Sequence, residues 1–207
     1  MLDFTEYTKI FISLFAIIDP FGIIPIIIAF TAGMTAQRRE RVGRMASLSV
    51  FGILLAALLL GEAILEFFGI SIHSFRTAGG ILLLLMSITM LTGPKPFPTD
   101  MTDGETTRSS LAIVPLSTPL LAGPGAISTV ILDAHKGSSV AHYAIMALVI
   151  ILLSVTVWLT FLAAPKVEKR MGQTGIYIFT RLMGLVLASI AVEFIAGGLR
   201  GLFPILE

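Results

Sequence analysis

The chain has 207 residues, of which 56% are hydrophobic and only 13% are charged, and its mean hydropathy is +0.96. Soluble domains carry about 25% charged residues, so this composition indicates a membrane protein and leaves little room for a soluble domain. A net charge of +1 with no basic patch gives no sign of a nucleic-acid partner, and the lack of cysteine excludes disulfides and thiolate metal sites.

Six apolar runs follow one another along the chain. A spanning helix needs about 20 mainly apolar residues, and each run reaches that length alone or with its flanks. The runs are 10–31, 45–61, 77–94, 109–132, 143–165 and 182–199. They predict an all-α membrane protein with six transmembrane helices.

The first run, "LFAIIDPFGIIPIIIAF", contains Asp19, Pro20, Gly22 and Pro25 at its centre. A charged residue at that depth costs roughly 3 kcal/mol, and each proline removes a helical hydrogen bond. Asp is a good N-cap and Pro is a good first helical residue. The run therefore predicts two half-helices, of which the second begins at Pro20 near the bilayer centre with Asp19 as its cap.

The fourth run, "VPLSTPLLAGPGAISTVIL", repeats this pattern about 100 residues later. Thr118 and Pro119 take the places of the Asp-Pro pair, and Pro124 follows at the same proline spacing as in the first run. Gly123 and Gly125 on either side of Pro124 favour further unwinding and close backbone approach. The fourth helix is therefore also predicted to be broken.

The remaining runs support an internal duplication. The third run begins "RTAGG" at Arg76 and the sixth begins "RLMG" at Arg181, while Gly69 and Gly172 precede these two runs. Three spans in each half send the second half into the membrane in the opposite direction. We expect two inverted repeats, 1–93 and 107–207, joined by the loop 94–106 within one transmembrane domain.

Inverted repeats with paired, interrupted helices point to the central site of a secondary transporter. Two half-helix N-termini would then meet at the midplane, where they favour an anionic group, while Asp19 would face a cation. A site with both characters suits a zwitterion such as an amino acid. The alternatives are that Asp19 and Thr118 are only helix caps and that Pro25 and Pro124 only kink the helices.

Three other charged residues are candidates for transport roles. Glu193 lies midway along the sixth run, where it either forms a proton-coupling pair with Asp19 or is hydrogen-bonded to its neighbours. Arg76 and Arg181 begin their runs, so they either reach to the headgroups or form ion pairs that hold a gate shut.

The positions of the histidines and the lack of known catalytic motifs in the sequence give no sign of an enzyme. His73, His135 and His142 fall in or beside loops at no metal-ligand spacing, so we expect them to be solvated at the interface and predict no metal site. No nucleotide-binding loop, G-x-S-x-G or H-E-x-x-H is present.

The positive charges predict an orientation. The first, third and fifth connections hold ten Lys and Arg residues, and the other connections and the termini hold four. Cytoplasmic loops carry the excess of these residues, so both termini are expected outside the cytoplasm.

Four segments resemble the MarC family of inner-membrane proteins, also described as the neutral amino acid transporter family. They are "FAIIDPFGIIPI", "FRTAGGILLLL", "PLSTPLLAGPGAIS" and "RLMGLVLASIAVEFI", and they cover both repeats. The resemblance implies a six-span transporter fold in the inner membrane and transport of glycine or alanine driven by an ion gradient. Glu193 departs from the neutral amide that we expect there, which leaves H⁺ and Na⁺ both open as the coupling ion. No other cofactor is implied.

The leading hypothesis is an ion-coupled symporter of small neutral amino acids that works by alternating access. The alternatives are a membrane scaffold or assembly protein without transport activity and an exporter of another small metabolite. The expected partners are the amino acid and the lipid bilayer, and homo-oligomer formation stays open.

Overall fold

The computed structural model describes residues 3–31, 33–92, 122–137 and 139–203, and every regular element in these ranges is a helix. The prediction of an all-α protein is therefore confirmed for this part of the chain. The helices are α1 (Phe4–Ile18), α2 (Ile24–Thr31), α3 (Ala36–Phe67), α4 (Ile72–Thr92), α7 (Pro124–Ala134) and α8 (Val140–Leu202).

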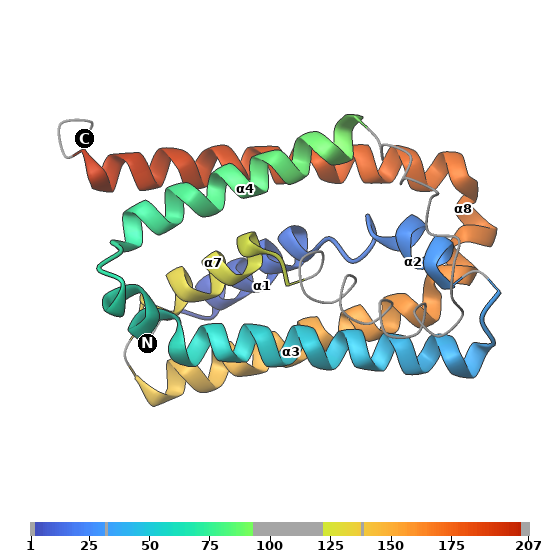
Figure 1. The fold of residues 1–207 in the computed structure, drawn as a ribbon, viewed down its shortest axis with the longest axis horizontal. Helices are drawn as coiled ribbons and strands as arrows, with labels where there is room; N and C mark the ends of the chain where they lie inside the picture. Colours follow the sequence, from blue (N-terminus) through green and yellow to red (C-terminus); the bar gives the residue numbers. More distant parts are fainter. Residues whose placement is uncertain (1–2, 32, 93–121, 138, 204–207) are drawn as a thin grey trace.

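The long helices form two pairs that enclose the short ones (Figure 1). One pair consists of α4 and the second part of α8, and the other consists of α3 and the first part of α8. Helices α1 and α7 lie between the pairs. Helix α7 contacts both, because Ile131 packs on Gly61 of α3 and Leu83 of α4 packs on Gly125.

Within the described residues, four helices are long and apolar enough to cross a membrane: Ala36–Phe67, Ile72–Thr92, Val140–Gly172 and Thr174–Leu202. They coincide with the second, third, fifth and sixth predicted spans. The first predicted span is divided into α1 and α2. Most of the fourth, with Thr118 and Pro119, lies outside the described residues, and α7 is its last part. The count of six spans and the inverted repeat stay predictions.

Glycines allow the helices to approach closely, as expected for a membrane bundle. A Cβ on Gly80 of α4 would lie 2.9 Å from the Ala191 carbonyl oxygen of α8, and a Cβ on Gly79 would lie 2.5 Å from Ser128 Oγ of α7. A Cβ on Gly184 would lie 3.2 Å from Met90 Cβ. The interfaces therefore depend on bare backbone at these positions.

Two glycines turn the chain between consecutive long helices. Gly69 (φ +65°) lies between α3 and α4, and Gly172 (φ +63°, ψ 173°) divides α8 into its two parts. Both have the left-handed φ that glycine adopts without strain, and neither would place a Cβ within 4 Å of another atom. The two positions that the duplication pairs thus share a positive φ and an equivalent place between consecutive long helices.

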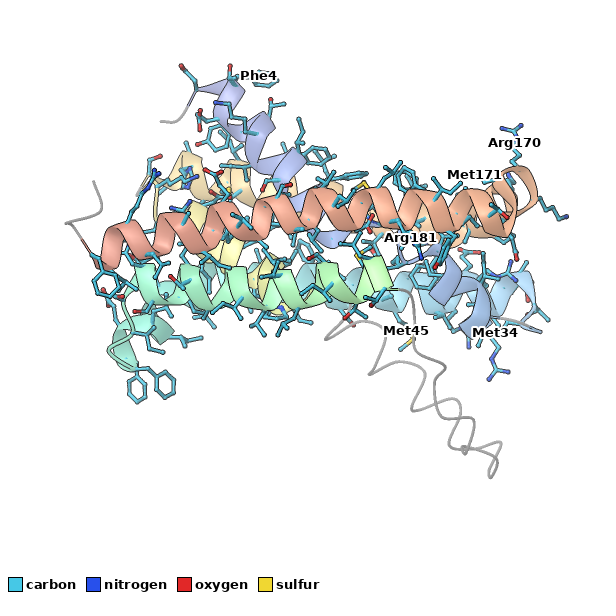
Figure 2. All side chains as sticks on the ribbon, turned by 90° about the horizontal axis from the view of Figure 1, so that it is seen from above. Phe4, Met34, Met45, Arg170, Met171 and Arg181 are labelled. Atoms are coloured by element: carbon cyan, nitrogen blue, oxygen red, sulfur yellow. The ribbon has the colours of Figure 1, made fainter. Side chains whose placement is uncertain are left out.

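The two ends of the bundle differ in charge. The basic segments 38–44 and 166–170 lie at one end, which we call the Arg170 end; Figure 2 shows Met34, Arg170 and Met171 there. The start of α1, the α3–α4 turn and the α7–α8 connection lie at the other end, which we call the His142 end (Figure 1). The distribution of charge along the sequence thus becomes a separation in space.

Candidate functional site

Helix α1 stops at Asp19, in the middle of the bundle (Figure 1). Asp19 is the C-cap, with φ 43° and ψ 64°, and its N–H donates to the Phe15 carbonyl oxygen at 3.0 Å. A residue before proline avoids the right-handed helical region, and Asp is one of the few residues that tolerate the left-handed region. The predicted break is present here.

The predicted role of Asp19 as N-cap of the second half-helix, with Pro20 as first helical residue, is wrong. Residues 20–23 form a turn, and α2 begins only at Ile24. The left-handed conformation of Asp19 reverses the chain direction locally, so a turn has to follow before a new helix can begin. Pro25 falls in the first turn of α2, where a missing N–H removes no helical hydrogen bond.

The carboxyl group of Asp19 is sealed inside the protein, with the residue 1% exposed. Its Oδ1 accepts a hydrogen bond from the Gly22 N–H at 3.1 Å, which closes the turn. Its Oδ2 is buried and has no hydrogen-bond partner among the residues that the structure describes. A buried oxygen without a partner costs about 1–3 kcal/mol, so this carboxyl is suited to taking up a proton or a cationic group.

Gly22 provides the room that the carboxyl occupies. A Cβ at this position would lie 2.7 Å from Asp19 Cγ and 2.8 Å from Met90 Cε of α4. The carboxyl therefore folds back onto bare backbone, with a flexible methionine beside it. Gly22, which the sequence predicts as a binding-site residue, thus lies directly against the Asp19 carboxyl group.

The second break comes just before α7. Gly123 is the N-cap, with φ −64° and ψ 169°, and Pro124 is the first residue of the helix. Ala122 and Gly123 are not helical, so no continuous helix runs from the predicted start at Pro119 into α7. Gly125 follows in the first turn, packed against Leu83.

Helices α2 and α7 both begin near the middle of the bundle and run toward opposite ends (Figure 1). Each helix N-terminus carries about half a positive elementary charge and unpaired N–H groups. The structure thus brings the start of α7 and the Asp19 turn to the same central region. A carboxyl group and a helix N-terminus, which favour groups of opposite charge, thus both occur in the middle of the bundle.

An apolar pocket of about 190 Å³ borders the Asp19 turn on the side of the Gly172 bend. Its lining residues are Phe21, Ile24, Val167, Met171, Ile176 and Phe179. The ring of Phe21 packs edge-on against Phe179 at 5.6 Å and against Phe15 at 5.9 Å. Phe21 and Phe179 thus form an aromatic part of the pocket wall.

Glu193 is not brought to Asp19. It lies on the exposed side of α8, whereas Gly184, Leu187 and Ala191 of the same helix are buried. Two residues beyond Ala191, a helix has turned by about 200°, which directs Glu193 away from the interior. Of the two alternatives for Glu193, the pairing with Asp19 is therefore not present in this structure.

The two arginines contact aromatic rings. The Arg76 guanidinium lies 5.5 Å from the centre of the Phe194 ring, and its Nε is buried without a hydrogen-bond partner in the described part of the chain. Arg181 stacks on Tyr177 at 4.4 Å and donates to its hydroxyl; Figure 2 labels it on α8. Neither has an ion pair with an acid among the described residues. The described residues therefore show aromatic contacts, and no ion pair, at these two positions.

The sequence reading missed a buried polar cluster at the His142 end. His142 is 1% exposed, and its Nδ1 lies 2.9 Å from the Tyr7 hydroxyl of α1. Its Nε2 lies 3.0 Å from the Asp133 carbonyl oxygen at the end of α7. The expectation that His142 is solvated at the interface is wrong. His135 does stay exposed, where it pairs with Glu62 of α3 at 2.8 Å.

The periodicity of the helices contains a signal for this cluster. Tyr7, Ile10, Leu14 and Ile17 share one face of α1, and all are buried. His142 lies on the buried face of α8 that continues through Met146, Ile150, Leu153 and Val157.

No group of three His, Asp or Glu residues that could hold a metal occurs in the described part of the chain.

The fold and the site thus define an integral membrane protein with a broken helix in its first half and a half-helix start in its second. The MarC family model, described as "MarC family integral membrane protein", matches residues 4–203. The chain belongs to this family, as its motifs predicted.

Relatives from distant organisms are similar over their whole length. UPF0056 membrane protein YhcE of Escherichia coli is 42% identical over 98% of this chain and 95% of its own. UPF0056 membrane proteins of Methanocaldococcus jannaschii and Bacillus subtilis (YvbG) are 39% and 36% identical, over 97% and 98% of this chain and 98% of their own. No solved structure matches the chain significantly.

Proposed function

We propose that this protein is a secondary active transporter of small neutral amino acids of the glycine and alanine type, coupled to H⁺ or Na⁺ and working by alternating access. The observation that carries the proposal is the central break, where the buried Asp19 carboxyl lies in the same region as the start of α7. Non-helical backbone at the depth of a membrane is tolerated where it is buried in protein or lines a cavity.

The chemistry of the two breaks fits a zwitterion. Asp19 Oδ2 has no partner among the described residues and would accept an ammonium group or a coupling ion once the site opens. The first N–H groups of α7, which follow Gly123 and Pro124, are suited to a carboxylate. Apolar side chains beside the Asp19 turn suit a small or absent side chain on the substrate. Whether transport runs inward or outward is a separate question, and export of another small metabolite fits the same site chemistry.

An inverted repeat is part of this proposal. Support comes from α2 and α7, which diverge from the middle, and from Gly69 and Gly172, which turn the chain between the long helices of each half. Rocking of one half against the other around a fixed central site is the motion that such repeats favour. The superposition of 1–93 on 107–203 tests this part.

A membrane scaffold without transport activity is the second candidate. The observation that favours it is the burial of Asp19, because an acid that is 1% exposed is not open to a substrate in this conformation. Alternating access also contains occluded states in which the central site is closed to both sides. The two candidates therefore differ in whether the carboxyl becomes accessible.

The decisive experiment is uptake of labelled glycine and alanine into proteoliposomes that contain the purified protein, with an imposed ΔpH or ΔNa⁺. We expect accumulation above that of empty liposomes with one of the two gradients. Equal signals from protein-containing and empty liposomes, with either gradient and either direction, would favour the scaffold.

We place the protein in the inner membrane, with the Arg170 end in the cytoplasm and both termini outside, because basic residues gather at that end. A reporter fused after Glu207 should register outside the cytoplasm, and one inserted after Gly33 between α2 and α3 should register inside. The reverse result for both reporters would invert the orientation.

A further inference from the structure

The two halves of the chain are joined by different contacts at the two ends of the bundle. At the His142 end, side-chain hydrogen bonds cross between the halves: Tyr7 to His142, and His135 to Glu62. Near the Arg170 end, Phe21 packs edge-on against Phe179 beside the pocket. Between α3 and α8, a further hydrogen bond crosses from one half to the other, where Ser47 Oγ donates to the Ser154 carbonyl oxygen at 2.6 Å. The crossing pairs at the His142 end differ from these contacts because they join two polar side chains.

The Tyr7–His142 hydrogen bond has a defined direction. A carbonyl oxygen only accepts, so His142 Nε2 carries the proton that is donated to Asp133. In the neutral ring Nδ1 is then an acceptor, and it accepts from the Tyr7 hydroxyl at 2.9 Å. Both ring nitrogens are thus engaged, and the rings of Tyr7 and His142 are in contact with their centres 5.6 Å apart.

Three segments meet at this imidazole. Tyr7 comes from the first turn of α1, Asp133 from the last turn of α7, and His142 from the first turn of α8. The Asp133 carboxylate is held by Lys136 at 2.6 Å, and the Tyr143 ring flanks His142 at 5.9 Å. Tyr7 and His142 are 7% and 1% exposed, so the cluster is closed to the surroundings.

The position of this cluster gives it a role. Helix α1 leads from Tyr7 inward to Asp19, and α7 leads from Asp133 inward to Pro124 (Figure 1). The two helices therefore run side by side between the His142 end and the central site. An opening between α1 and the α7–α8 connection would break the Tyr7–His142 hydrogen bond.

We infer that Tyr7, His142 and the Asp133 carbonyl form a latch that closes access to the central site from the His142 end. This inference rests on the alternating access proposed above, because a latch is needed only where an opening occurs. In this structure the Tyr7–His142 hydrogen bond is formed, so the latch is closed. The apolar pocket borders the Asp19 turn on the side of the Gly172 bend, toward the Arg170 end. The structure therefore corresponds to a state that is shut at the His142 end.

The natural lack of cysteine allows a direct test. In Ala122→Cys, a single thiol sits at the central break, where the native residue is 0% exposed. A membrane-impermeant thiol reagent is added to proteoliposomes from the side of the α7–α8 connection. That side is identified by rapid labelling of Lys136→Cys, whose native side chain is 52% exposed.

We expect Tyr7→Phe to increase the labelling rate of Ala122→Cys from this side about fivefold, the effect of losing one hydrogen bond on an opening equilibrium. Tyr143→Phe is the matched control, because its hydroxyl makes no hydrogen bond to another described residue, and it should leave the rate unchanged. His142→Gln should raise the rate like Tyr7→Phe, and it replaces that variant if Tyr7→Phe yields no folded protein.

An unchanged rate in the folded Tyr7→Phe and His142→Gln proteins overturns the latch. Equal increases from both sides of the membrane, or the same increase with Tyr143→Phe, also overturn it, because they indicate general loosening. The labelling needs no transported substrate. A latch-dependent rate in a protein that accumulates no amino acid would therefore reject the proposed transport function and retain the latch.

Discussion

The break after α1 and the break before α7 interrupt the two halves of the chain by different means. The first uses an acid with a left-handed backbone, followed by a turn that its own carboxyl closes. The second, where it is described, uses glycine and proline at a helix start and carries no charge. Two halves with similar proline spacing can therefore present different chemical groups: a carboxyl group at the first break and backbone N–H groups at the second.

The strongest test of this division is Asp19→Asn. Asn can still accept from the Gly22 N–H, so the turn and the fold should persist. The loss of the charge removes a charge-assisted contact worth about 1.5–3 kcal/mol, so gradient-driven uptake should fall roughly 10- to 100-fold. Uptake into proteoliposomes measures this, with the exposed Asp3→Asn as the control. Full uptake by folded Asp19→Asn protein would mean that the acid serves only as a cap.

A second test fills the room that the Asp19 carboxyl occupies at the same break. In Gly22→Ala, the new Cβ competes with the Asp19 carboxyl and with Met90, so we expect the free energy of unfolding to fall by about 1–3 kcal/mol. Thermal unfolding in detergent measures the change. Gly52→Ala in α3 is the matched control, since nothing lies within 4 Å of its Cβ, and it should be neutral or stabilising. A stable Gly22→Ala protein would show that the carboxyl has other room.

The smallest effect is expected from Thr118→Ala in the second half. This change removes one hydroxyl and no charge, so the apparent affinity for the amino acid should weaken by about 1 kcal/mol, or roughly fivefold. Concentration dependence of uptake measures it, with Thr92→Ala at the exposed end of α4 as the control. Equal and mild losses from Thr118→Ala and Asp19→Asn would remove the asymmetry between the breaks and place the site elsewhere.

The sequence predicted the helical class and the interruption at Asp19, because these follow from composition and local backbone chemistry. It predicted that Asp19 is the N-cap of the second half-helix, whereas Asp19 is the C-cap of α1. A residue before proline avoids the right-handed helical region, but both the extended and the left-handed regions stay open to it. Which of the two Asp19 adopts depends on the following turn, and that turn depends on Gly22 and its packing.

The polar contacts were less accessible to sequence reasoning. Tyr7 and His142 lie 135 residues apart, and only the folded chain brings their side chains together. Their positions on buried helix faces could have identified them as interior residues, but not as partners. Glu193 illustrates the converse: its place midway along a span suggested an interior acid, whereas its position on the helix face directs it outward.

The abrupt connection at Gly172 has a consequence for how the protein is made. Val140–Gly172 and Thr174–Leu202 are both long enough to cross a membrane, and almost no chain lies between them. Two such segments have no slack to enter the bilayer separately and wait for one another. We expect them to be inserted by the translocation machinery as one preformed hairpin, so that lengthening this turn would affect biogenesis before it affected any activity.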